Sequence, residues 1–312
     1  MSEFTQSDLI LRDDSPQMQY EPMGDKTHNV HKGQLKLMLA DELALMQALL
    51  HISSCGADIL PDIVSRNKKV AVLVAGGAPG EHFVDLSTTF HFLDFHLYDP
   101  AIWNHKLQER DTHSNVHLYT QYFDINTATQ WESRTSVEGQ KYVYVIFLCD
   151  LRVPTKDHPD ALVEVDMKLQ RSLTEQIRAE YTVLKFHPPY YQDKNIAKTY
   201  EYLDGTIYLE AFPPRNSSET RLHVTDPKST KTYDIQKYEN QLAYHNQETR
   251  MKTDYDNRYM TFVQKYIQSQ MTAFEFHFTA RGKFSHDIHK QARLQCLITL
   301  LVDMNHMNYM DY

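Results

Sequence analysis

Hydrophobic residues in this chain fall into short runs that alternate with longer amphipathic segments. The short runs hold four to eight residues and are rich in Val, Ile, Leu and aromatic side chains, which is typical of strands. The sequence predicts strands over the ranges 70–74, 95–98, 116–119, 142–149, 181–186, 206–210 and 220–224. The run over 70–74 is apolar throughout, as in a strand that is buried on both faces of a parallel sheet.

Amphipathic segments with helical spacing lie between most of these runs. The segment that begins at Gly33 and the segment over 161–178 each carry their apolar residues on one stripe. From Asp234 on, the pattern is mostly helical and includes an apolar helix over 288–302. Because strands and helices alternate, the sequence predicts an α/β protein with a doubly wound, mostly parallel sheet and added C-terminal helices.

The last two predicted strands are joined by only a short stretch over 212–218. A connection of this length favours a hairpin, so we expect the final strand to be antiparallel. No internal repeat and no low-complexity linker interrupts the chain, and we therefore expect one domain over 31–312. Residues 1–30 are polar and predict an N-terminal arm, which either lies over a pocket or is a disordered tail.

Composition narrows the class of protein further. The net charge of −9 argues against a long nonspecific grip on RNA, although a local pocket for one RNA feature stays compatible with it. Three widely spaced cysteines indicate a reducing compartment, so we expect a cytoplasmic protein without a disulfide framework. No apolar run approaches the length of a membrane span. His286 and His289 have metal-like spacing, but with 17 histidines in the chain we predict no metal site.

A glycine-rich loop directly follows the apolar strand over 70–74. Gly76, Gly77 and Gly80 permit positive φ and close approach of a ligand to the backbone. The spacing matches neither the dinucleotide pattern nor a P-loop, so no pyrophosphate cradle is evident. Asp99 lies 19 residues beyond Gly80, where an acid binds the ribose hydroxyls of an adenosine cofactor. The loop therefore favours S-adenosylmethionine over an ordinary strand-to-helix turn.

Four charged residues are predicted to meet at the carboxyl edge of the sheet, where open α/β sheets bind ligands. Asp150 follows the most hydrophobic strand, and Lys185 lies near the end of the next one. Glu219 begins the antiparallel strand on the same edge, and Lys36 can close the group from the first helix. For any one of these residues alone, a surface charge or a structural ion pair is the competing interpretation.

Such a group suits methyl transfer to a sugar hydroxyl. The hydroxyl is a poor nucleophile until its proton is removed, and a lysine whose pKa is depressed toward neutrality can remove it. Arginine cannot, because it stays protonated. A methyltransferase that acts on a small molecule would need the same chemistry, so the substrate stays open at this point.

Five short motifs occur in the order seen in poxvirus-type cap-specific mRNA nucleoside-2′-O-methyltransferases, which double as poly(A) polymerase small subunits. The motifs are Gly33-Gln34-Leu35-Lys36-Leu37, the Gly76–Gly80 loop, Asp150-Leu151-Arg152, Leu184-Lys185-Phe186 and Ser218-Glu219-Thr220-Arg221-Leu222. The chain resembles this family from about Tyr20 to Glu239. The resemblance implies a Rossmann-like S-adenosylmethionine-dependent methyltransferase fold.

The resemblance also implies roles for individual residues. Lys36, Asp150, Lys185 and Glu219 would form the catalytic tetrad, with Lys185 as the general base. The residues expected around S-adenosylmethionine are Gln34, Gly76, Gly77, Ala78, Pro79, Gly80, His82, Asp99, Phe123, Asp150 and Arg152. The residues expected around the 7-methylguanine of the cap are Tyr20, Tyr190, Tyr191, Asp193 and Glu239, with either Tyr190 or Tyr191 stacking on it.

The expected partner is therefore m7G-capped mRNA, whose cationic base gains from stacking on aromatic rings and from carboxylates on its edge. The resemblance implies methyl transfer to the ribose 2′-OH of the first transcribed nucleotide. It also implies a second partner, the catalytic subunit of a poly(A) polymerase. The alternative function is a processivity or regulatory subunit that clamps RNA, either without catalysis or in addition to it.

Overall fold

The computed structural model describes residues 3–20, 33–55, 62–63, 66–108, 114–151, 159–189, 198–214 and 217–279, without the side chains of residues 159–161 and 272–279. The predicted helix over 288–302 and the His286–His289 pair lie outside these residues.

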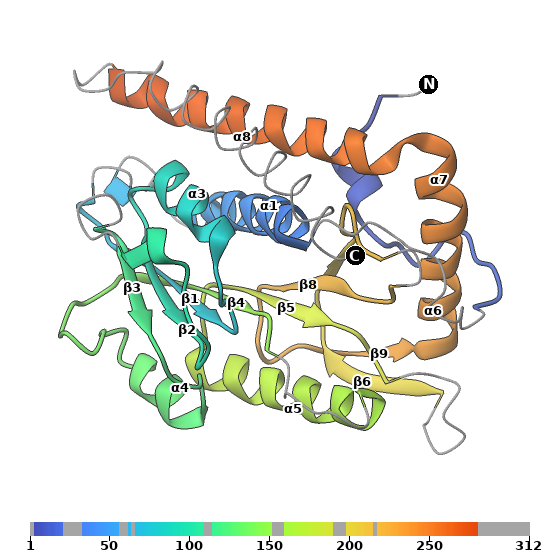
Figure 1. Ribbon diagram of the computed structural model, residues 1–312, viewed down its shortest axis with the longest axis horizontal. Coiled ribbons are helices and arrows are strands. Elements are labelled where there is room, and N and C mark those ends of the chain that lie inside the picture. The colour runs from blue at the N-terminus through green and yellow to red at the C-terminus, as the bar shows by residue number, and fades with distance from the viewer. Residues whose placement is uncertain are drawn as a thin grey trace.

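A seven-stranded sheet forms the centre of the molecule, in the order β3-β2-β1-β4-β5-β8-β7 (Figure 1). Its strands are β1 (Val70–Ala75), β2 (Asp94–Tyr98), β3 (Val116–Tyr119), β4 (Tyr144–Cys149), β5 (Tyr181–Phe186), β7 (Thr206–Tyr208) and β8 (Thr220–Val224). The first five strands in that order run parallel, whereas β8 is antiparallel to both β5 and β7. The prediction of a mostly parallel sheet with an antiparallel last strand is confirmed.

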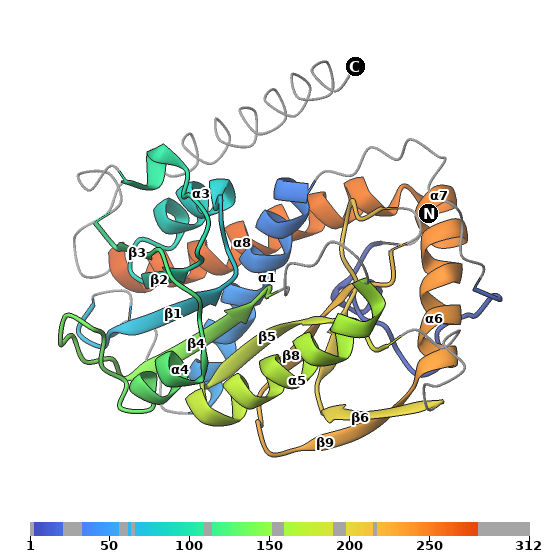
Figure 2. The same cartoon turned by 60° about the horizontal axis from the view of Figure 1, so that its bottom comes forward.

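Helices cover both faces of this sheet. On one face lie α1 (Gly33–Ser54), α3 (Glu81–Thr89) and α8 (Tyr255–Thr279), and on the other lie α4 (Ile125–Trp131) and α5 (Pro159–Ile177), as Figures 1 and 2 show. Every residue of β1 is buried, because the strand is covered from both sides. The strand order reverses between β1 and β4, which places a crevice at the carboxyl ends of these two strands.

The C-terminal part of the described chain is helical, as expected. It consists of α6 (Ile235–Tyr244), a π-helical turn (His245–Thr249), α7 (Arg250–Thr253) and α8. Asp254 has a φ of +51° at the junction of α7 and α8, where the chain turns sharply (Figure 1).

Several element boundaries differ from the predicted ones. Strand β4 begins at Tyr144 rather than at residue 142, and β7 ends at Tyr208 rather than at 210. Two strands were not predicted: β6 (Thr199–Leu203) and β9 (Thr230–Asp234) pair into a separate two-stranded sheet. In β9 most residues are exposed and polar, so this strand lacks the alternating apolar face that marks a strand in a sequence.

The N-terminal segment is more ordered than its polar composition indicated. Leu11 donates its N–H to Ile207 O and Leu209 donates to Leu9 O, at 2.9 and 2.8 Å, so residues 9–11 extend the sheet beyond β7. Leu9 and Leu11 are buried in the core. For these residues the expectation of an arm outside the core is wrong, because two leucines suffice to bury an otherwise polar segment against a sheet edge.

Candidate active site

The glycine loop after β1 brings the backbone of this strand against the end of β4. Gly76 has a φ of +82°, and a Cβ atom there would lie 3.0 Å from both the carbonyl carbon and the oxygen of Asp150. Gly80 has a φ of +74° and caps the start of α3. The prediction of positive φ is confirmed for these two glycines and is wrong for Gly77, which is instead confined by the side chains of Val74 and Phe83.

A pocket of about 420 Å³, including the open space at its mouth, lies beyond this loop. It is lined by Leu37, Asp41, Val74, Gly76, Gly77, Ala78, His82, Phe83, Leu148, Cys149, Asp150, Val183 and Arg221. The loop, the first turn of α3 and the end of β4 thus surround one cavity at the switch point of the sheet.

Asp99 and His82 hold the shape of this region. The Asp99 carboxylate accepts hydrogen bonds from the N–H groups of Ala78 and Ala101, at 3.1 and 2.8 Å, so it anchors the glycine loop. In His82, Nδ1 lies 3.0 Å from Gln34 Oε1 and Nε2 lies 3.2 Å from Asp41 Oδ2. These contacts tie α3 to α1 beside the pocket.

The four charged residues predicted to converge do meet. Lys36 Nζ lies 2.7 Å from Glu219 Oε1. Lys185 Nζ lies 2.8 Å from Asp150 Oδ1 and 3.2 Å from Glu219 Oε2, so its amine is held between two carboxylates. Four separate segments therefore supply one cluster, and Asp150 joins it to the pocket lining.

Two further members of this cluster were not predicted. Arg221 donates to Asp150 Oδ1 at 2.8 Å and to Glu210 Oε1 at 2.7 Å. Glu210 also accepts from Lys36 Nζ at 3.0 Å. The cluster thus holds three basic and three acidic side chains. One sequence signal for Arg221 was available: it follows Glu219 by two residues, and such residues share one face of a strand.

The partners of these groups fix their charges. Burial favours the neutral amine of Lys36, but the carboxylates of Glu210 and Glu219 outweigh it, so its pKa is raised. Burial likewise opposes ionisation of Asp150, but Arg221 and Lys185 lower the pKa of its carboxyl to about 2. Lys36 therefore stays a cation and Asp150 an anion at neutral pH.

The residues predicted to bind a cap are described in part. Tyr20 donates its N–H to Asn240 Oδ1 at 3.0 Å, so Tyr20 lies against α6. Asn240 is the residue that follows Glu239 in this helix. Glu239 is 3% exposed. The preceding residue, Tyr238, donates to Ser218 O at 2.7 Å, so this part of α6 adjoins the segment that carries Glu219. Arg152, Tyr190, Tyr191 and Asp193 lie outside the described residues.

Phe123 differs from the expectation of a cofactor contact. Its ring packs in the core, with centroids 4.9 Å from Tyr98 and 5.4 Å from Phe147. Like Gln34, Pro79, Gly80 and Asp99, it is not among the residues that line the pocket. The residue follows β3, whose end faces the crevice, but its aromatic side chain is directed into the sheet packing instead.

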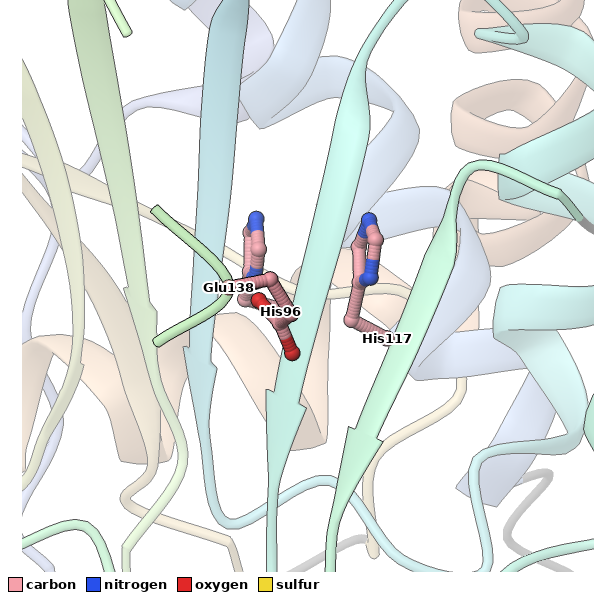
Figure 3. A group of neighbouring side chains, drawn as sticks. All are labelled: His96, His117 and Glu138. Carbon is pink, nitrogen blue, oxygen red and sulfur yellow. The ribbon is translucent and has the colours of Figure 1, made fainter. Parts of the chain in front are cut away.

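A second cluster of potential ligands lies on β2 and β3, in which His96 and His117 stack near Glu138 (Figure 3). The two rings are 4.5 Å apart and nearly parallel, so their nitrogens do not converge on one point. Both His96 nitrogens lie within 3.0 Å of hydroxyl groups, those of Tyr119 and Tyr142. This geometry fits a hydrogen-bonded aromatic cluster better than the tetrahedral ligand set of zinc.

The fold and the site together define an α/β protein with a buried lysine–carboxylate cluster beside a pocket at the carboxyl edge of its sheet. A sequence model of the poly A polymerase regulatory subunit family matches residues 6–292. The chain belongs to this family, which confirms the polymerase-subunit resemblance of its motifs. A search of curated protein sequences finds no match. None of the helices in the described part of the chain is long and apolar enough to cross a membrane.

Proposed function

We propose that this member of the family is an S-adenosylmethionine-dependent methyltransferase that modifies the ribose 2′-OH next to an m7G cap. The observation that carries the proposal is the amine of Lys185, which is held between Glu219 and Asp150, and Asp150 lines the pocket. A structural ion pair needs neither the adjoining pocket nor a second lysine. The strand order β3-β2-β1-β4-β5 is that of a nucleotide-binding doubly wound sheet, which supports the Rossmann-like fold.

The pocket fits the proposed cofactor in two respects. Gly76 and Gly77 line the pocket without a side chain, so a ligand there meets the backbone of the loop. Arg221 Nη2 is buried without a hydrogen bond and lies 3.5 Å from Glu219 Oε1, and this arginine lines the pocket. We expect Gln34, the 76–80 loop, His82, Asp99 and Asp150 to hold S-adenosylmethionine. When bound, it supplies a methyl group on a sulfonium.

The chain's own residues have distinct tasks in this proposal. Lys185 Nζ accepts the proton of the 2′-hydroxyl, and Asp150 and Glu219 keep the nitrogen in position. Lys36 remains a cation and fixes Glu219. Tyr20 and Glu239, together with Tyr190 or Tyr191 and Asp193, would select the cation of 7-methylguanine, so that an acidic protein binds capped RNA.

A direct assay tests this function. The purified protein is incubated with S-adenosylmethionine carrying a labelled methyl group and a short m7G-capped RNA, and nuclease digestion then locates the label. We expect label on the ribose of the first transcribed nucleotide and none on the matching uncapped RNA. Absence of transfer to capped RNA, or equal transfer to both RNAs, would contradict the proposal.

A non-catalytic or dual role in polyadenylation is the second candidate, and membership of the regulatory subunit family favours it. The partner would be the catalytic subunit of a poly(A) polymerase. Pull-down with that subunit and measurement of tail length test this role. If the protein lengthens tails but transfers no methyl group, the non-catalytic role in polyadenylation stands alone. Both activities together would show the dual role.

We predict that Gly76→Ala lowers affinity for S-adenosylhomocysteine at least about tenfold, because the new Cβ clashes with the backbone of Asp150. Gly139→Ala is the matched control, since Gly139 also has a positive φ, +81°, but no atom lies within 4 Å of its Cβ position. Both variants should lose about 1 kcal/mol of stability from the left-handed conformation. Calorimetric titration measures the affinity, and equal losses in the two variants would contradict the prediction.

A further inference from the structure

The segment between β7 and β8 carries a cluster carboxylate near each end, Glu210 and Glu219. Besides the Tyr238 bond from α6 to Ser218 O, three further hydrogen bonds link its described residues to the C-terminal helices. Asn246 Nδ2 donates to Ser217 O at 2.6 Å, and Arg250 Nη2 donates to Pro213 O at 3.1 Å. The N–H of Phe212 donates to Asp256 Oδ1 at 3.0 Å. All three anchors come from the π-helical turn and the α7–α8 corner, elements distant in sequence from the pocket.

Arg250 is the centre of this arrangement, which we call the corner clamp: Asn246, Arg250 and Asp256. Its guanidinium donates to Asp256 through Nε and Nη2, at 3.1 and 2.9 Å, and to Asn246 Oδ1 through Nη1, at 3.0 Å. The arginine side chain is 5% exposed. Such a fork of donors matches a carboxylate in two places at once, which a lysine cannot reproduce.

The clamp holds a backbone conformation that the chain would otherwise avoid. Phe212 has a φ of +57°, in the left-handed region that a bulky residue rarely adopts. Its N–H is bonded to Asp256, and the carbonyl of the next residue is bonded to Arg250. Backbone strain of this kind persists only where the surroundings over-determine it. Without the clamp, the segment is expected to relax toward φ below zero.

Such a relaxation would reach the charged cluster directly. Glu210 stands two residues before Phe212, and its side chain is 1% exposed. One of its oxygens accepts from Lys36 and the other from Arg221. At the other end, Glu219 stands two residues after Ser217 and contacts Lys36 and Lys185. A shift of the segment would therefore change the partners of both lysines.

We infer that the corner clamp positions Glu210 and Glu219, and through them Lys36 and Lys185, from outside the active site. Its consequence for methyl transfer rests on the proposed function. Arg250 and Asp256 are thus positioning residues, since they contact the segment and none of the four tetrad side chains. The π-helical turn carries Asn246 and leads directly into Arg250, so both side chains reach backbone carbonyls of this segment.

The test uses Arg250→Lys in the full chain, with Arg258→Lys as matched control, because Arg258 lies on α8 and stacks on Phe4 outside the clamp. Hydrogen exchange of residues 209–214 and 217–220 should accelerate at least tenfold in Arg250→Lys, while exchange in β1 and β4 stays unchanged. In the methylation assay kcat should fall about 10- to 100-fold, with the affinity for S-adenosylhomocysteine within twofold of wild type. The control should change neither.

The outcomes separate the clamp from the proposed function. If hydrogen exchange in Arg250→Lys accelerates only in this segment and the wild-type protein transfers no methyl group, the corner clamp is supported and the proposed activity is contradicted. Uniformly faster exchange, or a fall in cofactor affinity equal to the fall in kcat, would overturn the inference. If Arg250→Lys does not fold, Asp256→Asn replaces it, because asparagine keeps the side-chain volume. This variant should show the same local acceleration of exchange. Unchanged exchange in Asp256→Asn would equally overturn the inference.

Discussion

Replacing Lys185 by methionine should reduce methyl transfer to capped RNA by about 10²- to 10⁴-fold, the range expected for loss of a general base. Methionine retains the unbranched side chain as far as Cε, with sulfur in place of Cδ, and removes the amine. Asp150 keeps Arg221 as a partner at 2.8 Å, and Glu219 keeps Lys36 at 2.7 Å, so neither carboxylate is left unpaired. We therefore expect the variant to fold and to bind S-adenosylhomocysteine nearly as well as the wild type.

Single-turnover methylation measures this effect, and Lys168→Met is the matched control. Lys168 lies on α5, its side chain is 69% exposed, and it pairs with Glu164 one turn away. The control should lose no activity. Undiminished transfer by Lys185→Met would remove this residue from the mechanism, and equal losses in both variants would point to a general effect of the lost charge.

A second substitution at the same position separates a base from a fixed cation. Arginine keeps the positive charge between Asp150 and Glu219, but its guanidinium does not give up a proton at any accessible pH. If Lys185 acts as the base, Lys185→Arg should be as inactive as Lys185→Met. Recovery of most of the activity in the arginine variant would instead show that the cation orients the ribose and that another group takes the proton.

Much of the central sheet follows from local pattern. Strand β1 is apolar at every position because both of its faces are covered, and a run of this kind is visible in the sequence. The convergence of Asp150, Lys185 and Glu219 followed from one topological rule, namely that parallel strands end on the same edge. The antiparallel β8 was also accessible, since a short connection leaves few alternatives to a hairpin.

The missed features depend on contacts between distant segments. Glu210 and Arg221 are charged residues whose burial is tolerated because each finds partners from several elements. Leu9 and Leu11 pack into the core at the edge of β7, and the polar composition of the N-terminal segment does not predict this burial. The corner clamp likewise joins residues more than thirty positions apart in sequence, such as Arg250 and Pro213.

Lowering the pH from 7.5 to 5.5 should cost the protein about 4 kcal/mol of its unfolding free energy, because three histidines are buried as neutral groups. Burial lowers the pKa of His96, His223 and His245 to about 3 in each case. The rings of His96 and His223 are held by tyrosine hydroxyls, at 2.8 to 3.0 Å. His245 packs edge-on against Tyr255.

The direction of this change in stability follows from the pH at which the folded and the unfolded state each take up protons. Below about pH 6.5, the ordinary pKa of histidine, the unfolded chain binds one proton at each of these histidines. The folded protein binds none of these protons until about pH 3. Stability therefore falls with falling pH throughout this window. Each site contributes about 1.4 kcal/mol between pH 7.5 and 5.5. The carboxyl of Asp150, whose pKa is about 2, loses its contribution only below pH 4, so it does not act in this range.

Urea unfolding at pH 7.5, 6.5 and 5.5, followed by the fluorescence of the buried Trp103 and Trp131, measures the loss. A total of about 4 kcal/mol is a large part of the 5–15 kcal/mol typical of folded proteins, so the midpoint should shift clearly. In His96→Gln the loss should shrink by about 1.4 kcal/mol, because glutamine does not titrate. His105→Gln, at an exposed position of the short helix His105–Gln108, should leave the pH dependence unchanged. A stability that does not vary across this pH range would show that these three rings are protonated in the folded protein, and hence not sealed from water as the structure describes them.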